Sequence, residues 1–251
     1  MTRPVLLIGG MDSSGGAGIA RDLLAVHDAG LTARVAVTAV TAQTDRRVLA
    51  VDPVSPDLLA AQIEAALEEG VGAIKIGALC NAGLVRTMAA RLPDVPVILD
   101  PVLCSSSGHA LLEPEGIQAL LGLLLPRTTV LTPNLPELTA LKSALGMDPS
   151  SERIDVVEAL LERGCESVFL KGGHDRRSDG STDILYRAGK PPLSFRSPRY
   201  PFDLRGTGCQ LASGLAAALA DGKSLSDAIE ASRAQLEVRF REAHARRQCL
   251  P

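Results

Sequence analysis

Residues 205–220 read RGTGCQLASGLAAALA, a tight glycine turn that runs directly into a helix of small and apolar residues. The first N–H groups of a helix have no intrahelical partner, and the helix dipole adds positive potential at the same end. Phosphate and other anions bind at such ends. We therefore predict a phosphate-binding turn, with Cys209 in the first helical turn favoured as a thiolate. The turn itself consists of Gly206, Thr207 and Gly208.

A plainer interpretation of this stretch stays open. Gly-Thr-Gly before a helix is also typical of an ordinary loop, and a buried free cysteine usually only packs. The rest of the chain has to distinguish the two interpretations.

The composition is that of an ordinary globular protein, with 46% apolar and 22% charged residues in a chain of 251. The net charge of −3 gives no electrostatic attraction for nucleic acid or an anionic membrane, and 2% aromatic residues argue against base stacking. Uncharged apolar runs are too short for a transmembrane helix. We therefore expect a small-molecule partner rather than nucleic acid or a membrane.

The five cysteines are odd in number and have no Cys-x-x-Cys spacing. This pattern argues against a disulfide framework and against structural zinc. The apolar run at the start of the chain is too short for a signal peptide. A reducing, cytoplasmic location is the expectation.

Short apolar runs alternate with helical patterns, which predicts an α/β fold with a mainly parallel sheet covered on both faces. Strands are predicted at 5–9, 33–40, 48–51, 72–76, 95–99, 128–131 and 167–170, with a hairpin at 183–186 and 192–195. Helices are predicted at 19–29, 56–69, 82–92, 114–125, 135–145, 152–163, 211–220 and, in one or two pieces, 224–246. The simplest organisation is one domain over residues 1–251.

Helical spacing also predicts which side chains face the core. The expected inward residues are Ile19, Leu23, Leu24 and Val26 in the first helix, and Leu58, Leu59, Ile63 and Leu67 in the second. The basic residues between 233 and 247 are expected to form a solvated helix face. Residues 10–18 are expected to form a glycine-rich loop that fits neither the dinucleotide fingerprint nor the P-loop.

Polar residues gather at the carboxyl ends of the predicted strands, where open α/β sheets bind ligands. They include Gly10, Asp12, Gln43, Lys75, Asp100, Asn134, Lys171 and the turn at 206–209. Because parallel strands end at the same edge, we expect these residues to converge.

Several of these residues also have a plain structural interpretation. Asn134 and Glu137 have the spacing of a capping box, whereas a functional Glu137 would lie near Mg²⁺ or phosphate. Asp100 ends its strand either as a boundary or as a carboxylate for metal or phosphate. Lys171 either extends into solvent or reaches a phosphate. Lys75 lies in an apolar strand, so it requires a carboxylate partner unless it points to water at the sheet edge.

A set of motifs, in this order, resembles the hydroxymethylpyrimidine/phosphomethylpyrimidine kinase family of the ribokinase superfamily. The resemblance runs from about residue 5 to about residue 220, and its most specific members are the last three. The motifs are GMDSSGGAGI at 10–19, Gln43, KIG at 75–77, DPV at 100–102, Ser107-Gly108, TPNLPE at 132–137, LKGGH at 170–174 and GTGC at 206–209.

The resemblance implies a ribokinase-like three-layer α/β/α sandwich with little lid beyond the strands near 183–195, and a homodimer that uses ATP and Mg²⁺. Gln43 would hydrogen-bond an aminopyrimidine, with Gly10, Asp12, Ala17 and Val102 also at the substrate. Residues 206–209 would form the anion hole, with Cys209 as the base beside the substrate hydroxyl. Lys171, Asn134 and Thr207 would lie along ATP, and Asp100 and Glu137 near Mg²⁺.

Four positions depart from the family pattern. Arg205 replaces the usual histidine, Ala78 a methionine, Met11 a small or hydroxyl residue, and His109 an acidic residue. These departures leave the kinase class in place but leave the substrate open. The alternatives are pyridoxal or a related ring alcohol, or a non-catalytic pyrimidine-binding protein on the same scaffold.

Overall fold

The computed structural model describes residues 3–105, 108–172 and 180–248, whose nine strands form one sheet in the order β3-β2-β1-β4-β5-β6-β7-β8-β9. The central strands from β2 to β7 run parallel, whereas β3, β8 and β9 pair antiparallel at the edges. The mainly parallel sheet expected from the sequence is therefore confirmed. The strands are β1 (Val5–Asp12), β2 (Ala33–Gln43), β3 (Val48–Pro53), β4 (Ala73–Ile76), β5 (Val97–Leu99), β6 (Val130–Leu131), β7 (Ser167–Leu170), β8 (Gly180–Arg187) and β9 (Lys190–Pro198).

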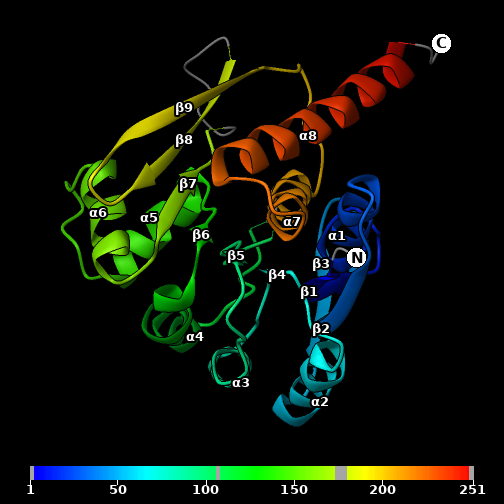
Figure 1. Cartoon of the computed structure of the whole chain (residues 1–251), viewed down its shortest axis with the longest axis vertical. Coiled ribbons are helices and arrows are strands. Elements are labelled where there is room, and N and C mark those ends of the chain that lie inside the picture. The colour runs from blue at the N-terminus through cyan, green and yellow to red at the C-terminus, as the bar shows by residue number, and fades with distance from the viewer. Residues whose placement is uncertain (1–2, 106–107, 173–179, 249–251) are drawn as a thin grey trace.

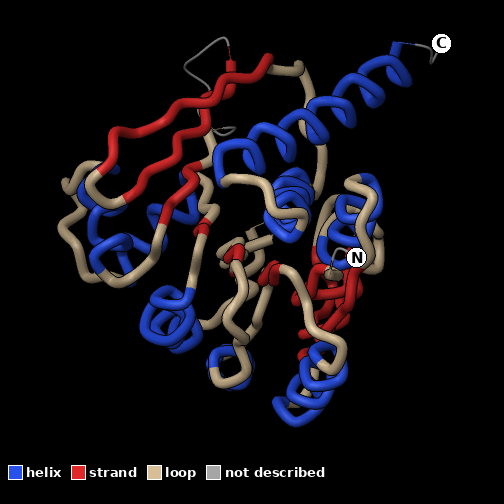
Figure 2. Tube along the Cα trace, in the orientation of Figure 1, coloured by secondary structure: helices blue, strands red, loops and turns tan. Residues whose placement is uncertain are grey.

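Helices cover both faces of the sheet and make it a three-layer sandwich (Figure 1). One face carries α1 (Gly18–Asp28), α7 (Thr207–Ala220) and α8 (Leu225–Gln248). The other carries α2 (Pro56–Leu67), α3 (Ala82–Ala89), α4 (Pro114–Ala119), α5 (Leu135–Ala144) and α6 (Arg153–Glu162). Figure 2 shows the two groups of helices on opposite sides of the strands.

Successive side chains of β1 point to opposite faces of the sheet, and this explains why there are two hydrophobic cores. Leu6 and Ile8 pack with the α2 side, whereas Val5 and Leu7 pack with the α7 side, and all four side chains are fully buried. A strand buried on both faces reads as a continuous apolar run, as this one does.

Helix α7 is small-residue rich because it is buried between the sheet and α8. Every residue from Gln210 to Ala218 is buried. A Cβ on Gly214 would lie only 2.7 Å from the Gln235 Oε1 atom of α8, so glycine permits the close approach of the two helices. The helix expected at 211–220 is confirmed, with its first turn included.

The first strand is longer than expected, and this corrects part of the predicted glycine loop. Gly10, Met11 and Asp12 continue β1 because β2 extends far enough to pair with them, through Ala39, Val40 and Thr41. The loop is therefore confined to the residues between Asp12 and Gly18, and the Asp12 carboxylate lies at the end of a strand.

The predicted inward faces of two helices are partly wrong. Leu23, Leu24 and Leu58 are 39%, 46% and 52% exposed, while Asp22 is fully buried. In α1 the face toward the sheet and α7 is formed by Ile19, Asp22, Ala25 and Val26. In α2 it is formed by Leu59, Ile63 and Ala66.

The helix predicted at 114–125 is interrupted. Helix α4 ends at Ala119, a π-helical segment covers Leu120–Leu124, and a 3₁₀ turn covers Leu125–Arg127. Almost every residue from Leu120 to Leu125 is leucine, so the spacing of apolar residues does not distinguish the three helix types in the sequence.

The C-terminal helix α8 is continuous, and the prediction of a wholly solvated basic face is wrong. Arg233 forms a salt bridge with Asp183 of β8 and donates to the Ser197 hydroxyl at 2.7 Å. Asp183 also accepts the Gly172 N–H at 2.8 Å. Helix α8 therefore anchors the edge strands next to Lys171. Among the described helices, none has the length and apolar character needed to cross a bilayer.

Candidate functional site

The N-terminus of α7 has the geometry of an anion-binding turn. Gly206 adopts a left-handed conformation with φ of 68°, and a Cβ there would lie 2.3 Å from the Gly16 carbonyl oxygen. The first intrahelical bond runs from the Gln210 N–H to the Gly206 carbonyl at 2.9 Å. The three N–H groups before it, of Thr207, Gly208 and Cys209, are therefore outside the intrahelical bonding pattern.

A cation and two carboxylates meet at this turn. The Lys171 ammonium lies 2.8 Å from Asp100 Oδ1 and 3.7 Å from Glu137 Oε2. A Cβ on Gly208 would lie 3.2 Å from Lys171 Nζ and 3.8 Å from Asp100 Oδ2. Three separate parts of the chain thus converge on the first turn of α7, as expected for strands that end at one edge.

Strand ends position these groups. The Asp100 N–H donates to the Ile76 carbonyl at 2.8 Å, directly after β5. Lys171 follows β7, and its N–H donates to the Pro133 carbonyl at 2.9 Å. Thr132 donates its hydroxyl to Asp100 Oδ1 at 3.1 Å and so fixes the carboxylate.

The predicted capping box of α5 is present. The Glu137 N–H donates to Asn134 Oδ1 at 2.8 Å, and the Asn134 N–H donates to Glu137 Oε2 at 2.7 Å. The structural interpretation of this pair is thereby confirmed. It does not exclude the functional interpretation, because the cap also holds the Glu137 carboxylate beside Lys171.

Burial and neighbouring charges set the protonation of this cluster. Burial raises the pKa of Glu137 to about 7, although Lys171 acts to lower it. Burial opposes the charge on Asp100, but Lys171 and Lys75 outweigh it and lower the Asp100 pKa. Burial likewise opposes the Lys171 cation, and Asp100 and Glu137 outweigh it and raise the Lys171 pKa. Lys171 is therefore a cation and Asp100 an anion at neutral pH.

Asp100 and Glu137 fit the donor set that proteins offer to Mg²⁺ in phosphate sites. Mg²⁺ is usually held there by one or two carboxylates together with substrate phosphates and water. Among the described residues, no group of three or more acidic, histidine or cysteine side chains forms a dedicated metal cage. An ion held by these two carboxylates would take its remaining ligands from phosphate oxygens and water.

The carboxylate partner that Lys75 requires is Asp22. The Lys75 ammonium lies 2.8 Å from Asp22 Oδ2, and the two side chains are 1% and 0% exposed. The Ser213 hydroxyl of α7 donates to the other Asp22 oxygen at 2.7 Å. The expected carboxylate partner is confirmed, and the alternative that Lys75 points to water is wrong. Burial opposes the Lys75 charge, but Asp22 outweighs it and raises the Lys75 pKa.

The expectation of a Cys209 thiolate is wrong for this structure. Burial raises the pKa of Cys209 to about 11, although Lys75 and a hydrogen bond from the Gly18 N–H act to lower it. The negative charges of Asp22 and Asp100 add to the effect of burial. At neutral pH the group is therefore a thiol.

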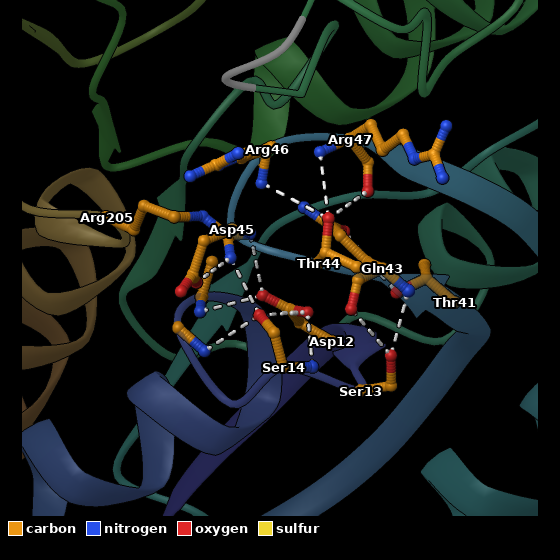
Figure 3. A network of polar contacts seen from close by, with 12 residues as sticks. Asp12, Ser13, Ser14, Thr41, Gln43, Thr44, Asp45, Arg46, Arg47 and Arg205 are labelled. Carbon is orange, nitrogen blue, oxygen red and sulfur yellow. Dashed lines mark hydrogen bonds and ion pairs between the residues drawn. The ribbon is translucent and has the colours of Figure 1, made fainter.

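A second polar group surrounds Asp12 and includes Arg205, the residue that directly precedes the turn (Figure 3). Asp12 Oδ2 accepts the Ala17 N–H at 3.0 Å, and Oδ1 accepts the Ser14 N–H at 2.9 Å. The Ser13 hydroxyl accepts the Gln43 N–H at 2.8 Å and donates to the Gln43 carbonyl at 3.1 Å. The predicted substrate residues Asp12, Ala17 and Gln43 thus meet at the same loop, which binds Asp12 through Ser14 and Ala17, and Gln43 through Ser13.

The two remaining predicted substrate residues are also at the strand ends. Gly10 lies in β1, and its carbonyl oxygen would be 2.2 Å from a Cβ on Gly18. Val102 is half-buried and donates its N–H to the Asp100 carbonyl at 2.8 Å. Gly173 and His174 of the LKGGH motif lie outside the described residues.

Sequence reasoning missed Asp22, Arg239 and the contacts of Arg205. Asp22 has the spacing of the buried face of α1, three residues after Ile19 and four before Val26, but nothing in an aspartate side chain indicates burial. Arg239 of α8 donates to the Gln210 side chain at 3.1 Å and to the Arg205 carbonyl at 2.6 Å. Nothing in the local pattern of α8 distinguishes Arg239 from its exposed basic neighbours.

Comparison with known proteins identifies similar chains over nearly the whole length. A family model described as phosphomethylpyrimidine kinase matches residues 12–248. A Mycobacterium tuberculosis hydroxymethylpyrimidine/phosphomethylpyrimidine kinase is 44% identical over 237 residues, covering 92% of this chain and 86% of that protein. A Rhizobium meliloti protein of the same name is 35% identical over 248 residues, covering 95% and 90%.

Solved structures of two kinds of kinase are similar to this one. The crystal structure of phosphomethylpyrimidine kinase from Clostridium difficile 630 has a TM-score of 0.80 at 30% identity, covering 95% of this chain and 99% of that one. The pyridoxal kinase from Staphylococcus aureus in complex with AMP-PCP and pyridoxal has a TM-score of 0.81 at 29% identity, covering 94% and 87%.

Replacement of Lys75 by methionine tests the buried ion pair. It leaves the Asp22 carboxylate buried without its cation, so we expect the free energy of unfolding to fall by about 3–5 kcal/mol. Urea denaturation measures this, with Arg91→Met in the exposed pair with Glu64 as a control that costs about 0–1 kcal/mol. The double variant Lys75→Met/Asp22→Asn is expected to recover part of the loss. A Lys75→Met protein as stable as the wild type would contradict this account.

The raised pKa of Glu137 predicts a pH dependence of stability. Because that pKa is about 7 in the folded protein, against an ordinary 4.5, the folded state binds more protons between these values. The stabilisation that protonated Glu137 contributes is therefore lost as the pH rises from about 4.5 through about 7. Relative to Glu137→Gln, we expect the wild-type free energy of unfolding to fall by about 2–3 kcal/mol between about pH 4.5 and about pH 8. Urea unfolding across this range, with the exposed Glu64→Gln as control, measures it, and a constant difference would rule it out.

Proposed function

The chain belongs to the phosphomethylpyrimidine kinase family, and we propose that it transfers the γ-phosphoryl group of ATP to 4-amino-5-hydroxymethyl-2-methylpyrimidine and then to its monophosphate. The protein is a phosphotransferase, and this reaction places it in thiamin biosynthesis. One observation carries the proposal: Lys171, Asp100 and the glycine turn of α7 meet at one point. We propose that the whole chain works as one kinase domain.

The turn of α7 supplies the charge stabilisation that phosphoryl transfer needs. The N–H groups of Thr207, Gly208 and Cys209 are proposed to face the oxygens of the moving phosphoryl group. Lys171 adds a point charge on the same side. Gly208 carries no side chain, so the phosphoryl group is able to approach the Lys171 ammonium, which a Cβ at this position would crowd at 3.2 Å.

Cys209 is proposed to receive the hydroxymethyl proton in the first step. With a pKa of about 11 in this structure, Cys209 acts as a base only as a thiolate, so its own proton has first to pass to solvent water. The Lys75 ammonium beneath it lowers the cost of that loss. The second step needs no strong base, because its acceptor is a phosphate already ionised at neutral pH.

Asn134 and Thr207 are proposed to lie along ATP with Lys171, and Asp100 and Glu137 to hold Mg²⁺. Their donor set fits an ion that phosphate oxygens share. When bound, Mg²⁺ neutralises charge on the phosphates. On the opposite side of the turn, Gln43 is proposed to hydrogen-bond the aminopyrimidine, next to Gly10, Asp12, Ala17 and Val102.

Pyridoxal is the second candidate substrate. The similarity to the Staphylococcus aureus pyridoxal kinase, with a TM-score of 0.81, favours keeping it. Ala78 and Met11 alter the residues that the resemblance leads us to expect around the ring. A non-catalytic pyrimidine-binding protein is the third alternative, although a binding protein has no need of the Lys171 and Asp100 cluster.

A coupled ATPase assay with Mg²⁺ tests these alternatives. Hydroxymethylpyrimidine, its monophosphate and pyridoxal are offered separately to the wild type, Cys209→Ala and, as a control, Cys104→Ala at an exposed cysteine. We expect turnover with both pyrimidines. Cys209→Ala should lower kcat with hydroxymethylpyrimidine by about 100-fold or more, since general-base catalysis typically contributes 10²–10⁴-fold, and Cys104→Ala should not change it.

Other results of this assay reassign the substrate or the mechanism. Turnover with pyridoxal alone would show that the protein is a kinase whose substrate is pyridoxal. Thermal stabilisation by a pyrimidine without any turnover would favour the binding protein. Full activity of Cys209→Ser in both steps would exclude the base role of Cys209.

We further propose a cytoplasmic homodimer. The edge hairpin of β2 and β3 carries two large exposed apolar side chains, Val40 and Leu49, at 54% and 59% exposure. Beside it lies a cavity of about 380 Å³ lined by Val51, Pro53, Cys80 and Leu111. Exposed apolar residues on an edge strand are typical of interaction surfaces.

Light scattering tests the dimer. We expect twice the chain mass of 26.2 kDa for the wild type, and the single chain mass for Leu49→Glu, because a carboxylate would have to be desolvated in the interface. Val238→Glu, at an exposed valine of α8, is the control and should stay dimeric. A monomeric wild type would exclude the dimer, and a dimeric Leu49→Glu would move the interface elsewhere.

A further inference from the structure

Arg205 connects three parts of the chain around the predicted ring site (Figure 3). Its Nη1 atom donates to the Ser14 hydroxyl at 2.7 Å and to Asp45 Oδ1 at 2.8 Å, and its Nη2 atom donates to Asp12 Oδ2 at 3.0 Å. Asp12 ends β1, Ser14 belongs to the glycine loop, and Asp45 belongs to the turn between β2 and β3. The planar fork of arginine suits several fixed acceptors at once.

These contacts enclose Gln43. Ser13, next to Ser14, binds both the N–H and the carbonyl of Gln43, and Asp45 is two residues further along the chain. A Cβ on Gly16 would lie 3.0 Å from Arg205 Nη1, so the guanidinium also lies directly against the glycine loop. The backbone of Gln43 is therefore held by the glycine loop, and Arg205 contacts both this loop and the turn that follows Gln43.

The other end of Arg205 is fixed as well. Its backbone directly precedes the Gly206 turn, and its carbonyl accepts the Arg239 guanidinium of α8 at 2.6 Å. Arg239 also donates to the side chain of Gln210 in α7 at 3.1 Å. The side chain of Arg205 thus spans from the rigid N-terminus of α7 to the loops around Gln43.

We propose that Arg205 is a positioning residue that fixes the distance between the phosphate-binding turn and the ring-binding residues. It acts through Asp12, Ser14 and Asp45, and the inference rests on the proposed function. A phosphoryl acceptor misplaced by about 1 Å can lose about 100-fold in rate, so this spacing matters for transfer. The resemblance leads us to expect histidine at position 205, and a histidine ring does not offer the two-pronged fork of donors that Arg205 presents here.

We expect the protein to fold without the Arg205 guanidinium, because its acceptors keep other partners or return to water. Asp12 keeps three other donors, namely the N–H and hydroxyl of Ser14 and the N–H of Ala17. The Asp45 side chain is 81% exposed and returns to water at little cost. Arg205→Met, which retains much of the aliphatic stem, therefore isolates the loss of the guanidinium.

The test measures kcat and both KM values for the wild type, Arg205→Met, Arg205→Lys and the control Arg241→Met. Arg241 is an exposed arginine that forms an ion pair with Glu237 one turn away in α8. With Arg205→Met we expect kcat/KM for hydroxymethylpyrimidine to fall about 10–100-fold, while KM for ATP changes less than about twofold. Titration calorimetry of the ring alcohol without ATP should show about tenfold weaker binding. Arg205→Lys should give intermediate values, because one ammonium cannot reach all three acceptors in the same geometry.

Three results would overturn the inference. They are an unchanged kcat/KM in Arg205→Met, a full return to wild-type values in Arg205→Lys, and equal losses for ring substrate and ATP accompanied by a lower Tm, which would show a merely structural role. If the wild type turns over only pyridoxal, the same kinetic and calorimetric measurements are made with pyridoxal as the ring substrate. A wild type without turnover or binding of any ring alcohol overturns the proposed function itself and this inference with it.

Discussion

The buried ion pair between Lys75 and Asp22 is the interaction on which the site depends. It joins the central strand β4 to α1, and through the Ser213 hydroxyl it joins both to α7. A charged pair in this position is costly to desolvate, and it is retained only if its geometry and hydrogen bonds are complete. Completing it fixes the rotation of α7, and with it the direction in which the first N–H groups of α7 point.

The arrangement of the sheet was predictable because it depends on patterns that are local in sequence. Apolar runs such as residues 5–8 identify buried strands, and alternation with helices implies parallel order. The convergence of Asp100, Lys171 and the glycine turn follows from the same rule, since all three lie at the carboxyl edge of the sheet. The requirement of Lys75 for a carboxylate was also predictable, from the cost of burying an unpaired charge.

Features that depend on contacts distant in sequence were not predictable. Leucine at positions 23 and 24 and aspartate at 22 suggest the wrong inward face of α1, because only the ion pair explains a buried aspartate. Arg233 and Arg239 look like the other basic residues of α8 until their partners on β8 and α7 are known. The protonation of Cys209 depends on the balance between burial, three charges from different elements and one backbone hydrogen bond, which spacing alone does not reveal.

The burial of α7 along residues 210–218 has a consequence for motion. A helix packed on the sheet, α1 and α8 at once cannot shift or rotate without disturbing all three, so the turn at its N-terminus belongs to the rigid part of the molecule. The loop 13–17 and the turn 44–47 on either side of Gln43, by contrast, are short segments held by side-chain hydrogen bonds. We therefore expect any adjustment to the size of a ligand on the proposed acceptor side, while the proposed phosphate side keeps one geometry. A family built on this plan is able to change its ring substrate through loop residues without altering the machinery of transfer.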